Sequence, residues 1–191
     1  MPESAPRPGL QQRVTDAILD GAAQLFATGA EPASMNEVAE AAGVARATVY
    51  RYFPNREALL EALAQAALRD VDLRLASASI ETVSPDEGVA RAVRALVDMG
   101  SLFVVLARER QRSGGERFER GLVEPLRRLV ERGQAGGDIR DDIPAPRLVE
   151  SLIGLIVGML PSAPALGRED MTATITDLFL DGARARGPRR R

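Results

Sequence analysis

The sequence predicts an all-α protein of about nine helices, because two kinds of signal recur along its 191 residues. Apolar residues return every three or four positions in almost every segment, which is the period of a helix with one buried face. Residues that favour helix starts (Ser34, Asn55 and Ser84) precede several segments, and glycine or proline follows many of them. We expect helices over residues 12–28, 34–42, 46–52, 55–79, 84–100, 101–112, 117–133, 147–160 and 169–185.

Composition limits the chemistry that the chain can perform. Hydrophobic residues make up 45% and charged residues 27%, which is typical of a soluble globular protein. With no cysteine there is no disulfide, thiolate nucleophile or cysteine zinc site. With no histidine the usual general base is missing, and a metal site would need carboxylates alone. We therefore predict no enzymatic activity, no cofactor and no metal.

The chain opens with residues 1–10, rich in proline and serine, which we expect to form a flexible N-terminal arm. Arg7 within it could enter a minor groove, although a solvated tail is favoured. The arm lacks the apolar stretch of a signal peptide, which predicts a cytoplasmic protein. The helix over 12–28 should follow and end at Gly29. Its inner face carries Val14, Ile18, Ala22, Leu25 and Phe26.

The stretch from Ser34 to Arg56 predicts two short helices joined by a tight turn. Ser34 and Glu37 fit a capping box at the first start, and Gly43 suits the left-handed residue that ends that helix. On the second helix Val49 points inward, so the helical period places its neighbours outward or on the flanks. By spacing alone, a generic helical hairpin with a solvated outer face is an equally good interpretation.

Charge is distributed unevenly around this hairpin. The whole chain has a formal net charge of −2, which by itself does not indicate nucleic-acid binding. The stretch 41–56 nevertheless contains three arginines (Arg46, Arg51 and Arg56) and no acidic residue. Affinity for a polyanion depends on where the charge lies, so this segment is a candidate DNA-binding surface.

The hairpin and its flanks resemble the TetR-type transcriptional repressors over about residues 11–60. The resemblance is strongest in the run AGVARATVYRYFPNREAL. It is carried by Ile18, Ala22, Ala23, Leu25, Phe26, Gly29, Val38, Ala39, Ala42, Gly43, Val44, Thr48, Val49, Tyr50, Tyr52, Phe53, Arg56 and Leu59. It implies a three-helix helix-turn-helix DNA-binding domain over 11–56 and a helical effector-binding and dimerisation domain over 57–186. By composition, residues 187–191 are expected to form a basic tail. It also implies a homodimer on a palindromic double-stranded operator, released by a small-molecule effector.

Within the hairpin we assign candidate DNA contacts by side-chain chemistry and by this resemblance. Arginine can bind guanine edges through two hydrogen bonds, and hydroxyl groups can bind phosphate. Candidate base contacts are Arg46, Ala47, Arg51 and Asn36. Candidate phosphate contacts are Thr48, Tyr50, Tyr52 and Arg56, with Ser34 mainly a helix cap. The resemblance places Arg56 on a phosphate at the start of the next helix, whose dipole helps.

Beyond residue 56 the sequence is less specific. The helix over 55–79 joins the hairpin to the rest, so we expect it to act as the lever between ligand and DNA. The charged segment 107–121 is expected to be a solvated turn, with a charged effector site as the alternative. Pro125 should kink its helix. The segment 147–160 is too short to span a membrane, so we expect it to be buried on most sides.

Two sets of apolar residues are candidates for the effector pocket and for the dimer interface. The pocket walls, for which core packing is an equally good explanation, are Val97, Met99, Phe103, Phe118, Leu122 and Leu152. The dimer interface would contain Leu152, Leu155, Ile156, Met159, Ile175, Leu178 and Phe179. Few polar groups accompany the first set, which mildly favours an apolar effector. Two other functions stay open: an all-helical protein-interaction scaffold and, less favoured, a small helical enzyme.

Overall fold

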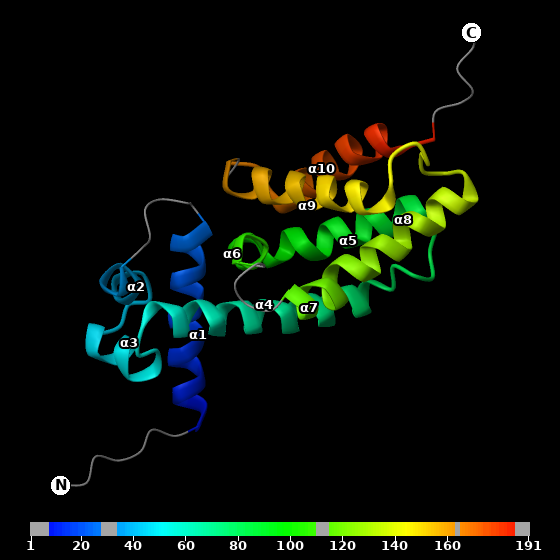
Figure 1. The fold of residues 1–191 in the computed structure, drawn as a ribbon. Helices are drawn as coiled ribbons and strands as arrows, with labels where there is room; N and C mark the ends of the chain where they lie inside the picture. The colour runs from blue at the N-terminus through cyan, green and yellow to red at the C-terminus, as the bar shows by residue number, and fades with distance from the viewer. Residues whose placement is uncertain (1–7, 28–33, 110–114, 163–164, 186–191) are drawn as a thin grey trace, which may run out of the picture.

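The structure is a computed structural model that describes residues 8–27, 34–109, 115–162 and 165–185 (Figure 1). These residues are almost entirely helical, which confirms the predicted all-α class. The elements are α1 (Pro8–Ala27), α2 (Met35–Ala41), α3 (Arg46–Tyr52), α4 (Arg56–Ala78), α5 (Pro85–Met99), α6 (Ser101–Glu109), α7 (Gly115–Phe118), the π-helical turn η1 (Glu119–Val123), α8 (Glu124–Gly136), α9 (Ala145–Ser162) and α10 (Arg168–Ala183).

Helix α1 begins at Pro8, four residues before the predicted start at Gln12. Proline fits the first position of a helix because its missing N–H would have no intrahelical partner there. The predicted flexible arm over 1–10 is therefore wrong for residues 8–10. The rest of that arm, the expected helix end at Gly29 and the basic tail over 187–191 lie outside the described residues.

The helix predicted over 117–133 consists of α7, η1 and α8, which follow one another without a break from Gly115 to Gly136. Pro125 was expected to kink it. The irregularity is a π-helical turn just before that proline, in which the N–H of Glu124 bonds to the carbonyl of Glu119, five residues back. A proline ring crowds the carbonyl four residues earlier, and a wider turn relieves this crowding. The disturbance was predicted, but its form was not.

The helices are arranged around two apolar clusters. The smaller cluster is built from α1, α2, α3 and the first turns of α4, and the larger one fills the space between α4, α5, α8, α9 and α10. Helix α6 belongs to both, because Val104 and Val105 lie in the smaller cluster while Phe103 and Leu106 lie in the larger one. Figure 1 shows α2 and α3 at one end of the molecule and α4 running from them toward the larger cluster. Both α4 and α6 therefore connect the two parts.

The structure corrects part of the predicted dimer interface. Leu152, Ile156, Ile175 and Phe179 are buried within the single chain, so they belong to its core and are not a surface for a second copy. Helices α9 and α10 lie side by side and cover each other and α5, which supplies the partners that the sequence pattern could not identify (Figure 1). Leu155 and Met159 are half-buried, and Leu178 is 56% exposed. These three stay candidates.

Helix α9 is 18 residues long, longer than the segment 147–160 predicted for it. Within the described part of the chain it alone is long and apolar enough to cross a membrane, judged by length and composition only. A core helix of a soluble protein passes the same test. Leu148, Val149 and Ile153 pack in the larger cluster, which places one face of α9 in the protein interior.

Candidate nucleic-acid interface

Helix α2 is fixed at its start by the predicted capping box. The backbone N–H of Ser34 donates to Oε2 of Glu37 at 2.7 Å, and the backbone N–H of Glu37 donates to Oγ of Ser34 at 3.3 Å. These hydrogen bonds, first the one from the Ser34 backbone, hold the pKa of the Glu37 carboxyl below its ordinary value. At the other end Gly43 has a φ of +65°, which suits a residue without a Cβ. The turn into α3 is thus set by local chemistry.

Helix α3 presents a mostly exposed face between two buried anchors. Val49 is fully buried and Phe53 nearly so, which attaches the helix to the smaller cluster. The exposed side chains of α3 are Arg46, Ala47, Tyr50 and Arg51, and the half-buried ones are Thr48 and Tyr52. Asn36 on α2 is also exposed. All the side chains predicted to contact DNA therefore have some access to solvent, and their individual roles stay predictions.

Each of the three arginines in this region lies over an aromatic ring. The Cζ atom of Arg46 is 5.3 Å from the ring centroid of Tyr50, and that of Arg51 is 5.4 Å from the ring centroid of Tyr52. Among the described residues, none of these guanidinium groups forms an ion pair. A ring orients a guanidinium through its face and leaves the N–H groups free to donate. Such arginines are ordered in advance for phosphates or guanine edges.

Arg56 differs from the other two because it is half-buried at the first turn of α4. Its Cζ atom lies 5.0 Å from the ring centroid of Phe26, and its buried Nε has no hydrogen-bond partner among the described residues. Asn55 caps this helix by accepting from the N–H of Ala58 at 2.8 Å, as the sequence predicted. The positive end of the α4 dipole and the terminal N–H groups of Arg56 together suit a phosphate.

Two contacts that the sequence analysis did not identify position this hairpin. The first is the close approach of α1 to α2 at Gly21, where an added Cβ would lie 2.9 Å from the backbone nitrogen of Ala42. The second is Arg108 near the end of α6, which donates to the carbonyls of Ala27 at 2.9 Å and Phe26 at 3.2 Å. A glycine inside a helical pattern was the only signal for the first. The second joins residues 81 positions apart and leaves no local signal.

Comparison with known proteins shows that the segment containing this hairpin is similar to a known family. The sequence profile described as "Bacterial regulatory proteins, tetR family" matches residues 18–63, which include α2, α3 and the start of α4. The helix-turn-helix segment of the chain therefore matches the tetR family. An uncharacterized HTH-type transcriptional regulator of Mycobacterium tuberculosis, MT1294, is 38% identical over 114 residues, which are 56% of each chain. The HTH-type transcriptional repressor LfrR of Mycolicibacterium smegmatis is 38% identical over 101 residues, which are 50% of each chain.

The tetR-family likeness extends to the whole fold. The crystal structure of LfrR from Mycobacterium smegmatis in complex with proflavine superposes with a TM-score of 0.71 at 23% identity, over 91% of this chain and 97% of that one. At that identity the likeness concerns the fold alone. The matches to the two curated relatives span only about half of the length of each. The resemblance read from residues 11–60 is confirmed by the family match over residues 18–63, and the overall fold is also similar.

The predicted pocket walls all lie in the larger cluster. Val97, Met99, Phe103, Leu122 and Leu152 are at most 7% exposed and pack as core. Phe118, also buried, lines a cavity of about 340 Å³ between η1 and α9. For the other five the structure favours core packing, the alternative that the sequence left open. Among the described residues, no three carboxylates gather closely enough to hold a metal ion.

Proposed function

We propose that this chain is a ligand-responsive, DNA-binding transcriptional regulator, and in particular a repressor that binds a palindromic operator as a homodimer and is released by a small molecule. The single observation that carries the proposal is the exposed face of α3, on which two ring-stacked arginines flank Ala47 within a family helix-turn-helix. A helix of this kind enters the major groove, and two of them in a two-fold dimer contact two half-sites.

Release by a ligand requires a connection between the ligand and the hairpin. The structure contains two: α4, predicted as the lever, and α6, whose residues pack in both apolar clusters. Arg108 of α6 bonds directly to the last carbonyls of α1, against which α2 packs. A ligand that shifts α6 or α4 would change the spacing between the two copies of α3 in the proposed dimer. It can do so only by binding the two geometries with different affinity.

The relatives support a regulator over the two alternatives. LfrR is named a transcriptional repressor, and its structure was solved with proflavine, a small molecule. The sequence contains neither histidine nor cysteine, which disfavours an enzyme, and a scaffold would leave the arginine face of α3 without a role. We propose that the protein works in the cytoplasm and not in a membrane. The exposed Leu178, with the half-buried Leu155 and Met159, is the proposed dimer contact.

Selection from a pool of random duplex DNA tests this function. The purified chain should enrich one palindromic motif with half-sites about one helical turn apart, or a multiple of it. The variant carrying both Arg46→Ala and Arg51→Ala should fold and enrich no motif. If the wild-type chain retrieves no motif but stably captures a partner protein, the scaffold function replaces this proposal.

A further inference from the structure

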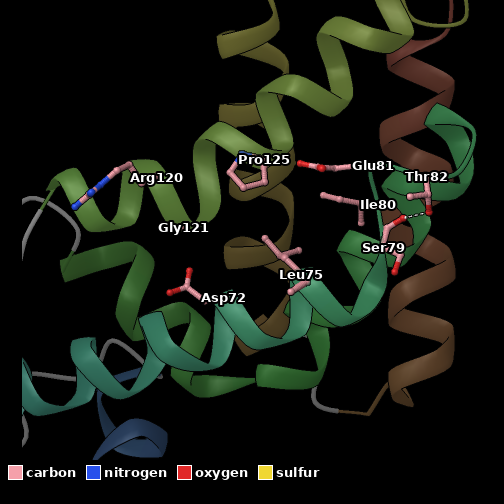
Figure 2. Close-up of a pocket in the computed structure, with 10 residues that line it drawn as sticks. Asp72, Leu75, Ser79, Ile80, Glu81, Thr82, Arg120, Gly121 and Pro125 are labelled. Carbon is pink, nitrogen blue, oxygen red and sulfur yellow. Dashed lines mark hydrogen bonds between the residues drawn. The ribbon is translucent and has the colours of Figure 1, made fainter.

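A cleft of about 430 Å³ lies between the second half of α4, the turn that follows it, and the junction of η1 with α8 (Figure 2). Small-molecule sites commonly have volumes of roughly 300–1,000 Å³. Leu75, Ile80 and Pro125 give it an apolar lining, and none of the residues predicted as pocket walls contributes to it. Its charged lining residues are Asp72, Glu81 and Arg120.

Asp72 has the one carboxylate of this cleft that is left without a partner in the described part of the chain. Figure 2 shows it projecting from α4 toward Gly121 of η1. It can approach only because residue 121 is glycine, since an added Cβ there would overlap Oδ1 of Asp72. An unpaired charge beside apolar side chains is the arrangement that recognises a ligand of opposite charge.

Of the other two charged groups, Glu81 is paired and Arg120 is turned away from the apolar lining. Glu81 lies 3.5 Å from Nη2 of Arg128, which offsets its charge. Arg120 donates its Nε–H to the carbonyl of Glu116 at 3.4 Å, and its guanidinium points away from Leu75 in Figure 2. Arg120 keeps its positive charge but directs it away from the apolar lining, so the exposed carboxylate of Asp72 is the unpaired charge on that side of the cleft.

Hydrogen bonds hold the walls of the cleft in place, and the helix end beside it is also negatively polarised. Arg132 of α8 donates to the carbonyls of Ile80 at 2.8 Å and Val83 at 3.0 Å, and Thr82 donates to the carbonyl of Ser79 at 3.0 Å. These bonds hold the turn after α4 in place, so the cleft is preformed. Ser79 caps the end of α4, and the negative end of a helix dipole favours a cation nearby.

We infer that this cleft is the effector site and that it takes an organic cation with an aromatic or apolar body, whose charge lies beside Asp72. The inference rests on the proposed function, because such a ligand would be the effector that releases DNA. It replaces the mild preference for an apolar effector that the sequence analysis indicated. An apolar body still fits Leu75, Ile80 and Pro125, and the unpaired carboxylate of Asp72 favours a positive charge on the ligand.

A pair of planar dyes tests the inference directly. N-methylacridinium has a fixed positive charge, and N-methylacridone is a neutral molecule of similar shape. Fluorescence titration of the full-length chain should show tighter binding of the cation. Asp72→Asn should weaken cation binding about fivefold, the scale of one partly exposed charge pair, and leave the neutral dye unaffected. Gly121→Ala should also weaken cation binding, because its methyl group displaces the carboxylate.

The matched control is Asp70→Asn. Asp70 is two residues away on the same helix, pairs with Arg74 at 2.8 Å and does not line the cleft, so this variant should bind the cation normally. Equal binding of both dyes, cation binding that is indifferent to Asp72→Asn, or no binding of either dye would overturn the inference. No DNA is present in the titration. Asp72-dependent binding without any selected DNA motif would show a cation site in this cleft, but it would overturn the proposed function and with it the effector role. A selected motif without Asp72-dependent binding would overturn the inference and leave the proposed function standing.

Discussion

The contact between α1 and α2 allows a direct test of how the hairpin formed by α2 and α3 is positioned. An added methyl group at Gly21 would lie 2.9 Å from the nitrogen and 3.2 Å from the Cα of Ala42, and 3.1 Å from the carbonyl carbon of Ala41. All three are backbone atoms, so no side chain can move aside to relieve the contact. Gly21→Ala must therefore separate α1 from the end of α2, close to the turn that leads into α3.

The size of the effect follows from two opposing terms. Overpacking of a well-packed interior costs about 1–3 kcal/mol, and replacing glycine by alanine within a helix gains about 1 kcal/mol. Gly182→Ala in α10 is the matched control, because no atom of the described residues lies within 4 Å of its added Cβ and only the gain applies. The free energy of unfolding, measured with urea, should be about 1–3 kcal/mol lower for Gly21→Ala than for Gly182→Ala. Operator affinity should fall in the first variant alone.

Equal stabilisation by the two substitutions would show that α1 and α2 are not in close contact at this point. Normal operator binding by a destabilised Gly21→Ala chain would also contradict the argument. In that case the spacing of these helices would not determine the position of α3.

Four further predictions concern single side chains. Arg51→Ala should cost about 1–3 kcal/mol of operator binding and relax the preference for one base pair, whereas an equal loss on random DNA would indicate a phosphate contact. Arg56→Ala should weaken binding to all sequences and lower the salt slope by about 1, and an unchanged slope would remove Arg56 from the phosphate contacts. Arg108→Met should lower the free energy of unfolding by about 1 kcal/mol, because it removes both hydrogen bonds to α1. It should also weaken the effect of a ligand on DNA release. Unchanged release would show that the contact between α6 and α1 does not transmit ligand binding. Leu178→Arg should give a stable monomer by light scattering, whereas a chain that stays dimeric would place the interface elsewhere.

The fold was largely predictable because its signals are local. The capping box at Ser34 and Glu37, the left-handed Gly43 and the cap at Asn55 all depend on residues within four positions of each other. The helical period also identified the buried faces of α5 and α9. It could not identify what covers them. Leu152 and Ile156 have the pattern of an interface residue and of a core residue alike, and only the packing of α9 in the larger cluster distinguishes the two.

The candidate site was predictable where it lies on one helix and unpredictable where it joins distant segments. The outward face of α3 follows from the buried Val49 alone. The bonds from Arg108 to α1 and the approach of Asp72 to Gly121 link residues 81 and 49 positions apart, so no spacing rule could find them. The π-helical turn was not predictable for a different reason. Pro125 indicates that the helix is disturbed, but several backbone conformations can accommodate a proline.

The central claim, that α3 reads DNA in the major groove, can be tested with a single cleavage reagent. The chain has no cysteine, so Ala47→Cys can be labelled uniquely with an iron chelate that cuts nearby DNA. On the selected operator the label should cut within both half-sites, about one helical turn or a multiple of it apart. The same label at Ala135→Cys, an exposed alanine near the end of α8, should give no cuts. Cleavage from position 135 but not from position 47, with operator binding intact, would contradict the account.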